Sequence, residues 1–336
     1  MKLRYIKVLF VFLVLLLQSC NGQEKINGIS FVAAGIPVTD EHVNPVIELN
    51  ANFAAIMPFG FIKDLKNPEI IYNTDRQWFG ETRAGTLQYA KSLQAKDIKI
   101  MIKPHIWIWN GKFTGYMKMK TEADWLKLET SYSSYILDNA HLAEDINAEI
   151  FCIGTELEQF VANRPQFWNK LINKIKKIYK GKLTYAANWD EYKRTPFWSQ
   201  LDYIGIDAYF PVSDNKTPTV ENCMEGWKVH KSSIKELYDH YKKPVLFTEY
   251  GYRSVNYAGK EPWVSDRSLT VVNLEAQNNT TTALFNTFWK EQWFAGGFIW
   301  KWFIAHDVVG GNDDSQFTPQ NKPVEKIIKS HFEKHK

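Results

Sequence analysis

The chain has 336 residues, of which 45% are hydrophobic and 23% charged, and its formal net charge is +4 at pH 7. This length and apolar content suffice for one large folded domain, and the modest, dispersed charge argues against nucleic-acid binding. The sequence contains no Gly-rich phosphate loop and no HExxH or CxxC spacing, so we expect no cofactor and no metal. Aromatic residues are 15% of the chain, with 13 Trp, and their flat faces suit sugar rings as well as core packing.

The N-terminus has the pattern of an export signal. Three basic residues precede an unbroken apolar run over residues 8–17, which is too short to span a bilayer comfortably as a helix. The run ends in Leu-Gln-Ser before Cys20, which resembles a lipoprotein cleavage site. We expect residues 1–19 to be a signal peptide, Cys20 to carry a lipid, and residues 20–27 to form a tether. The lipid would anchor the exported protein to the outer membrane or cell surface of a bacterium; the alternative is an ordinary secretory signal.

The remaining sequence alternates short apolar, β-rich runs with amphipathic stretches. Eight strands are predicted at residues 29–35, 54–61, 99–108, 149–158, 182–190, 202–210, 244–252 and 295–303. Helices are predicted at residues 86–96, 121–145, 164–179, 225–241 and 274–293. This alternation predicts an α/β fold, a (β/α)8 TIM barrel, as a single domain over residues 28–336. A doubly wound sheet is the alternative, but it usually carries a Gly-rich turn after its first strand.

Two glutamates end predicted strands on the working face of this barrel, which is the carboxyl end of the strands. Glu156 ends the fourth strand and, by the two-residue period of a strand, shares a side with Cys152 and Gly154. Glu249 ends the seventh strand and shares a side with Phe247. Glycoside hydrolysis requires two carboxyl groups that flank one glycosidic bond. We therefore interpret the pair as catalytic rather than as two unrelated surface ion pairs.

Other polar and aromatic residues near the strand ends are candidate substrate contacts. They are His105, Trp107, Asn188, Trp189, Asp207, Tyr209, Trp263 and Trp300. His105 either binds a sugar hydroxyl, orients a glutamate, or is a structural histidine. The phenol of Tyr209 is placed to hydrogen-bond Glu249 and keep it ionised. Asp207 binds sugar hydroxyls or, alternatively, forms a buried ion pair with Lys103.

Six sequence runs resemble glycoside hydrolase family 113. They are KPHIW at 103–107, IGTEL at 153–157, DYIGIDAYF at 202–210, TEYGY at 248–252, PW at 262–263 and GGFIW at 296–300. Their order and placement carry the resemblance, which spans about residues 29–303. That family belongs to a clan of retaining barrel glycosidases. The resemblance therefore implies Glu156 as acid/base, Glu249 as nucleophile and a β-1,4-mannanase activity, which is a hydrolase of polysaccharides.

One residue departs from the pattern of this clan. Many clan members have Asn directly before the acid/base, where it bonds the sugar 2-hydroxyl, whereas this chain has Thr155. The departure leaves the substrate open, and a barrel glycosidase acting on another β-glycan is the first alternative. The second is a non-catalytic lipoprotein that binds glycans at the cell surface. In either case the expected partners are a polysaccharide or oligosaccharide and, through the lipid, a membrane.

Overall fold

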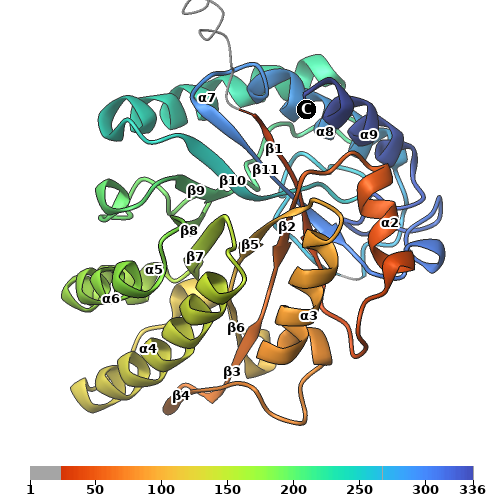
Figure 1. Ribbon diagram of the computed structural model, residues 1–336. Coiled ribbons are helices and arrows are strands. Elements are labelled where there is room, and N and C mark those ends of the chain that lie inside the picture. The colour runs from red at the N-terminus through yellow and green to blue at the C-terminus, as the bar shows by residue number, and fades with distance from the viewer. Residues whose placement is uncertain (1–23, 267, 336) are drawn as a thin grey trace, which may run out of the picture.

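The computed structural model describes residues 24–266 and 268–335, and its centre is a closed barrel of parallel strands (Figure 1). Around the barrel the strands are, in order, β1 (Ile26–Phe31), β11 (Phe294–Trp302), β10 (Val245–Tyr250), β9 (Ile204–Asp207), β8 (Lys182–Asn188), β7 (Ile150–Thr155), β5 (Lys99–Ile102) and β2 (Phe53–Ile56). Each of the eight predicted strands supplies one of these barrel strands. The predicted (β/α)8 fold is therefore confirmed.

Helices surround the barrel. They are α2 (Asp40–Glu48), α3 (Arg83–Gln94), α4 (Glu122–Asp145), α5 (Glu158–Asn163), α6 (Pro165–Ile178), α7 (Val220–Tyr241), α8 (Leu274–Phe288) and α9 (Pro323–Lys334). The five predicted helices correspond to α3, α4, α6, α7 and α8. The hydroxyl of Thr121 caps α4 by accepting a hydrogen bond from the Asp124 N–H at 3.1 Å. Helices α2, α5 and α9 were not predicted, and α2 contains the helix-disfavouring Pro45.

Two predicted strands are each divided at a proline. The strand predicted at 54–61 breaks at Pro58, and the one predicted at 99–108 breaks at Pro104. Because proline has no backbone N–H, it cannot donate to a barrel ladder. The outer halves form a separate sheet in the order β4–β3–β6, with bounds β3 (Phe59–Asp64), β4 (Asn67–Ile71) and β6 (His105–Ile108). We call it the accessory sheet, and it extends outward beyond β2 and β5 (Figure 1).

Two layers of apolar side chains hold the barrel. The inner layer fills the barrel itself and consists of Ile26, Phe53, Ala55, Met101, Ile150, Cys152, Ala186, Leu246, Ala295 and Phe298, with Tyr203 packed against it. A larger layer joins the outer faces of the strands to the helices. Since the interior is filled by side chains, substrate access is confined to the mouth of the barrel.

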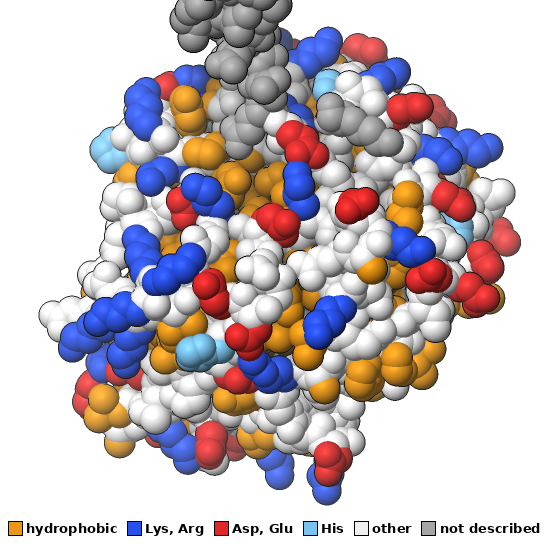
Figure 2. All heavy atoms as spheres, in the orientation of Figure 1, with side chains coloured by type: hydrophobic (Ala, Val, Ile, Leu, Met, Phe, Trp, Pro, Cys, Tyr) orange, Lys and Arg blue, Asp and Glu red, His pale blue; other side chains and the backbone are white. Residues whose placement is uncertain are grey.

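The N-terminal predictions fall mostly outside the described residues. This holds for the predicted signal peptide at 1–19 and for Cys20, while the last residues of the predicted tether already belong to β1, which begins at Ile26. None of the helices in the described part of the chain is long and apolar enough to cross a bilayer. Over most of the face seen in Figure 2, acidic and basic side chains are interspersed, and a group of basic side chains lies at its left edge.

Candidate active site

A buried cation lies in the mouth of the barrel, directly after β5. The side chain of Lys103 is fully buried, and its Nζ lies 3.1 and 3.3 Å from the two carboxylate oxygens of Asp207. The same Nζ donates to Oε1 of Glu249. Tyr209 donates its O–H to Oε2 of Glu249, and Thr248 donates to Oδ1 of Asp207, each at 2.7 Å. The predicted Tyr209 hydrogen bond is present, and so is the alternative ion pair between Asp207 and Lys103.

A β-bulge turns Glu249 into the mouth. The register of β10 against β9 shifts between Phe247 and Glu249. Phe247 points outward and packs against Trp227 and Phe288 of the helix layer, whereas Glu249 is 5% exposed and contacts Lys103. The prediction that Phe247 and Glu249 share a side of the strand is therefore wrong, because a bulge inserts an extra residue and re-aims the next side chain.

Glu156 directly follows β7 and has a left-handed backbone conformation. Its φ is 51°, which costs a non-glycine residue about 1 kcal/mol or more. The turn is fixed on both sides, since the Glu156 N–H donates to the Ala186 carbonyl at 2.8 Å and the Leu157 N–H donates to the Tyr185 phenol at 2.7 Å. Maintaining such strain at the end of a barrel strand is characteristic of a functional position.

Strand β7, which ends just before Glu156, contains a second register shift. The register of β7 against β8 shifts between Cys152 and Thr155. Cys152 lies in the inner layer, whereas a Cβ at Gly154 would meet Trp168 of the helix layer at 3.0 Å. The prediction that Cys152 and Gly154 share a side is therefore wrong for the same reason as in β10. Thr155 donates its O–H to the carbonyl of Pro104 at 3.3 Å, so this hydroxyl proton is already used in a hydrogen bond within the protein.

The charges in the mouth give its groups different protonation states. Burial, together with the negative charges of Asp207 and Glu249, holds the pKa of Glu156 well above its ordinary value of 4.5. Burial and the charge of Glu249 raise the pKa of Asp207 to about 7, against the opposing effect of Lys103. Burial disfavours the charged form of Lys103, but its two carboxylate neighbours more than offset this and raise its pKa. Burial also lowers the pKa of His105 well below 6.5, so the imidazole is neutral near pH 7.

His105 and Trp300 lie beside the cluster of Lys103, Asp207, Tyr209 and Glu249. Nε2 of His105 is 3.7 Å from Oε1 of Glu249 and has no hydrogen-bond partner within the described part of the chain. The His105 ring is parallel to the indole of Trp300, with an interplanar angle of 7° and ring centroids 6.1 Å apart. A neutral imidazole with an unpaired buried nitrogen can exchange a hydrogen bond with a sugar hydroxyl.

Three further predicted residues lie close to one another, and one of them neighbours Asp207. Asn188 is opposite Asp207 in the register of β8 and β9, and its side-chain oxygen accepts from the Trp189 N–H at 2.8 Å. The rings of Trp189 and Trp263 stack, with centroids 4.8 Å apart and an interplanar angle of 17°. Trp263 is 40% exposed, so this aromatic pair presents a surface to solvent.

Trp107 lies outside the cluster formed by Lys103, Asp207 and Glu249. It is on β6 of the accessory sheet, two residues beyond His105, and is 51% exposed. It pairs in register with Phe61 of β3. The structure thus places Trp107 on the accessory sheet rather than beside Glu249.

One buried acid near Glu156, Glu191, was not predicted from the sequence. Glu191 is 2% exposed, accepts from the Tyr185 phenol at 2.7 Å and from the Asn188 N–H at 3.1 Å, and burial raises its pKa to about 8. The sequence signal was the spacing of Asn188 and Glu191, three residues apart, which allows a side chain to bond back to a free N–H. Across the described ranges, no group of three or more His, Cys, Asp or Glu side chains is placed to hold a metal ion.

Sequence comparison agrees with the site. The profile of Glycoside Hydrolase Family 113 matches residues 36–322. The chain belongs to this family. It is therefore a glycoside hydrolase, and the resemblance noted in the sequence is confirmed. No match was found among curated proteins.

Solved structures of glycosidases share the fold. The GH113 β-mannanase of Alicyclobacillus acidocaldarius superimposes with a TM-score of 0.81 at 22% identity, covering 93% of this chain and 98% of that one. Another GH113 β-1,4-mannanase gives 0.80 at 20% identity, covering 92% and 99%. The Faecalibacterium prausnitzii β-glucuronidase gives 0.61 at 13% identity, covering 93% of this chain and 49% of that one. At these identities the likeness establishes the barrel fold.

Proposed function

We propose that this GH113 member is a retaining β-1,4-mannanase, with Glu249 as nucleophile and Glu156 as acid/base. The observation that carries the proposal is the pairing of Glu249 with Lys103 and Tyr209, beside a carboxyl group whose pKa is raised. One acid is thus held ready to attack and the other ready to donate a proton. The mannan substrate is supported by the β-mannanases of the same family that share the fold.

In the first step the nucleophile replaces the leaving sugar. An oxygen of Glu249 attacks the anomeric carbon while the glycosidic C–O bond breaks, and Glu156 gives its proton to the departing oxygen. Lys103 and Tyr209 donate hydrogen bonds to the attacking carboxylate, which keeps it oriented toward the sugar. Loss of the Glu156 proton leaves this group able to act as a base.

In the second step water releases the sugar. Glu156 takes a proton from a water molecule, the water oxygen bonds to the anomeric carbon, and the ester bond to Glu249 breaks. The two inversions restore the original anomeric configuration. Nε2 of His105 lies beside Glu249 and has no hydrogen-bond partner among the described residues, and the indole of Trp300 is parallel to the His105 ring. From these positions they can hold the sugar through a hydrogen bond and through stacking.

The proposal is tested with purified variants on mannan and on aryl β-mannosides. Glu249→Ala should lower kcat by several orders of magnitude while the circular dichroism spectrum stays native. Glu156→Ala should retain activity on substrates with good leaving groups, and azide should accelerate it by replacing water. Proton NMR of the first products should show the β-anomer. A native rate for Glu249→Ala, or glycan binding without product release, would contradict the proposal.

A different β-glycan is the second candidate substrate, and Thr155 is the observation that favours it. Its O–H is donated to the Pro104 carbonyl, so it is engaged within the barrel wall at the position where clan members use Asn for the sugar 2-hydroxyl. Reducing-sugar assays on mannan, glucan and galactan decide between the candidates. A higher kcat/KM for glucan or galactan than for mannan would show that the preferred substrate is that glycan and not mannan.

We further propose that Cys20 is lipidated and anchors the enzyme to a bacterial membrane. The support is the sequence itself, a basic start, an apolar run and a small residue before the cysteine. Cys20→Ala expressed in a Gram-negative host should move the protein from the membrane fraction to the soluble fraction or leave it unprocessed. Retention of the variant in the membrane fraction, at the native processed mass, would contradict lipid anchoring.

A further inference from the structure

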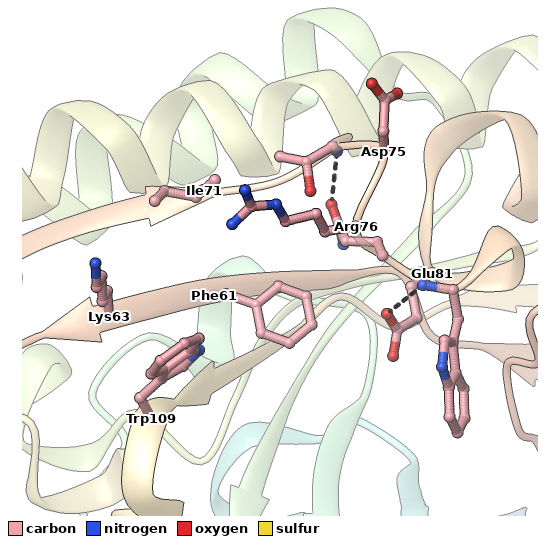
Figure 3. Close-up of a pocket in the computed structure, with 10 residues that line it drawn as sticks. Phe61, Lys63, Ile71, Asp75, Arg76, Glu81 and Trp109 are labelled. Carbon is pink, nitrogen blue, oxygen red and sulfur yellow. Dashed lines mark hydrogen bonds between the residues drawn. The ribbon is translucent and has the colours of Figure 1, made fainter.

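A groove lies on the accessory sheet, outside the cluster around Glu249. Its volume is about 730 Å³, which is within the range of ligand sites. Phe61, Trp78 and Trp109 supply aromatic rings to its lining. Figure 3 shows Phe61 lying between Trp109 and Glu81, with Arg76 beside it and Lys63 beyond Trp109.

The two faces of the accessory sheet differ in character. Ile62, Ile70 and Ile108 point to one face and are buried, and α4 packs on that side. The alternate residues point to the other face, which is open. On β3 these include Phe61, which is half-buried, and on β6 they include the exposed Trp107. An open aromatic face of this kind on a sheet marks a binding surface more often than a folding requirement.

The open face is continuous with the catalytic cluster. His105, at the start of β6, is 3.7 Å from Glu249, and in register Phe59 pairs with His105 and Phe61 with Trp107. The ring centroids are 5.2 Å apart for Phe59 and His105 and 6.2 Å apart for Phe59 and Phe61. Each two-residue step along a strand advances about 7 Å. A row of rings therefore leads from the proposed nucleophile to the wall of the groove.

We propose that this groove is a distal subsite, which holds a remote part of the same β-glycan chain whose bond is cleaved at Glu249. This inference rests on the proposed function and deepens it. Trp78 and Trp109 are 59% and 54% exposed, so their faces are free to pack against the C–H bonds of sugar rings.

The charged groups of the groove indicate a neutral glycan. Lys63 and Arg76 are matched by Asp75 and Glu81 in the same lining, so the groove has no excess of either sign. Their side chains supply hydrogen-bond donors and acceptors for hydroxyl groups. An anionic polysaccharide would instead be expected to meet an excess of Lys or Arg.

The test is the double variant Trp78→Ala/Trp109→Ala, assayed on long manno-oligosaccharides and on a short aryl β-mannobioside. The readout is the ratio of kcat/KM for the long substrate to kcat/KM for the short one. Since a stacked aromatic contact contributes roughly three- to tenfold in binding, the ratio should fall about tenfold or more. Val229→Ala, an exposed position on α7, is the matched control and should leave the ratio at its wild-type value.

The outcomes separate this subsite from the proposed function. An unchanged ratio, or an equal loss on both substrates, would overturn the subsite. A wild-type enzyme that cleaves neither substrate would overturn the proposed function instead, and the subsite is then decided by electrophoresis through gels containing mannan. Retardation of the wild type that is lost in the double variant supports the groove, and absence of retardation contradicts it.

Discussion

At the scale of single residues, Lys103 is the cation on which two buried carboxylates depend. Asp207 and Glu249 both contact its Nζ, and neither side chain is appreciably exposed. Removing charges from water costs several kcal/mol for each ion, and only mutual attraction with full hydrogen bonding repays it. Thr248 and Tyr209 complete that bonding, one on each carboxylate. The cluster is therefore a unit, and in the proposed mechanism Lys103 would act on the sugar through Glu249.

Replacing this cation should affect both stability and the pH profile. Lys103→Met removes the charge and retains length, leaving Asp207 and Glu249 buried without their partner. We expect a loss of about 3 kcal/mol or more in the free energy of unfolding. The acid limb of the kcat/KM profile should move to higher pH, because the cation that favours ionised carboxylates is gone. Urea unfolding measures the first effect and a pH–rate profile the second. If the variant folds and the acid limb of its kcat/KM profile stays at the wild-type pH, Lys103 has a structural role only.

Glu191 leads to a prediction about stability and pH. Burial raises its pKa from the ordinary 4.5 to about 8, so between these values the folded state keeps a proton that the unfolded state has lost. Stability associated with this group is therefore present below pH 4.5 and declines as the pH rises toward 8. Glu191→Gln should show a smaller fall in urea midpoint from pH 5 to pH 9 than the wild type. Equal falls in the two proteins would contradict the buried, protonated state.

At the scale of elements, the sequence predicts strands well and side-chain directions less well. The two-residue period gives the correct result for Asp207 and Tyr209, which both reach the cluster, although β9 ends at Asp207 and the Tyr209 N–H turns back to the Asp207 carbonyl. It fails at Phe247 and Gly154, because both lie next to a register shift. A bulge depends on how a strand pairs with its neighbours, which no single run of residues encodes. Glu249 itself was identified by its place at a strand end rather than by its parity.

The accessory sheet was missed for a different reason. Pro58 and Pro104 were visible in the sequence as strand breakers, but both lie inside apolar runs that read as continuous. The pairing of the two outer halves with β4 depends on contacts between segments far apart in the chain. For the same reason the sequence predicted Trp107 as a sugar contact without showing that it lies on a separate sheet.

The close approach of β8 and β9 leaves no room for a side chain at Gly205. A Cβ at Gly205 would lie 2.2 Å from the Tyr185 carbonyl oxygen and 2.4 Å from Oγ1 of Thr184, so Gly205→Ala must push the strands apart. We expect a loss of about 1–3 kcal/mol in unfolding free energy, together with reduced kcat because Asp207 is two residues away. Gly35→Ala is the control, since a Cβ there meets nothing within 4 Å. Equal unfolding free energies for the two variants would mean that β8 and β9 can separate enough for the added methyl group without loss of stability.

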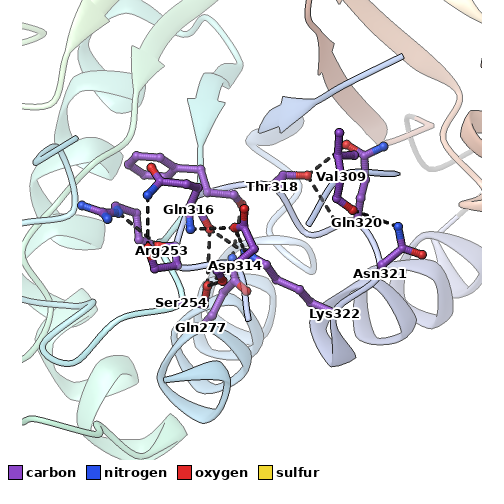
Figure 4. A network of polar contacts seen from close by, with 12 residues as sticks. Arg253, Ser254, Gln277, Val309, Asp314, Gln316, Thr318, Gln320, Asn321 and Lys322 are labelled. Atoms are coloured by element: carbon purple, nitrogen blue, oxygen red, sulfur yellow. Dashed lines mark hydrogen bonds and ion pairs between the residues drawn. The ribbon is translucent and has the colours of Figure 1, made fainter. Parts of the chain in front are cut away.

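At the scale of the whole molecule, the loops at the mouth are tied together by a polar network. Lys322 is buried and donates to Ser254 Oγ at 2.9 Å and to the Gln316 carbonyl at 2.7 Å, while pairing with Asp314 at 2.8 Å (Figure 4). Arg253 donates to the Ser315 carbonyl at 3.2 Å. The network joins the segment after β11 to the loop after β10, and that loop carries Trp263 to the mouth.

The C-terminal end of α9 lies against the amino end of β1, far from the mouth, and its packing there should affect stability alone. Asn27, near the start of β1, donates to the carbonyl oxygens of Phe332 and His335 at 3.4 and 3.1 Å. The Phe332 ring is fully buried there. Phe332→Ala should therefore lower the free energy of unfolding by about 3–5 kcal/mol. Lys329→Ala, an exposed change on the same helix, should alter it by less than about 0.5 kcal/mol.

Catalysis distinguishes a local effect of this substitution from a global one. At temperatures well below unfolding, KM and the pH optimum of Phe332→Ala should match those of the wild type, because Phe332 lies at the amino end of β1 whereas Glu249 lies at the carboxyl end of β10. Barrel enzymes separate stability from activity in this way when the inner layer transmits little between its two ends. A shifted pH optimum in the fully folded variant would show instead that packing around Phe332 changes the ionisation of the carboxyl groups in the mouth.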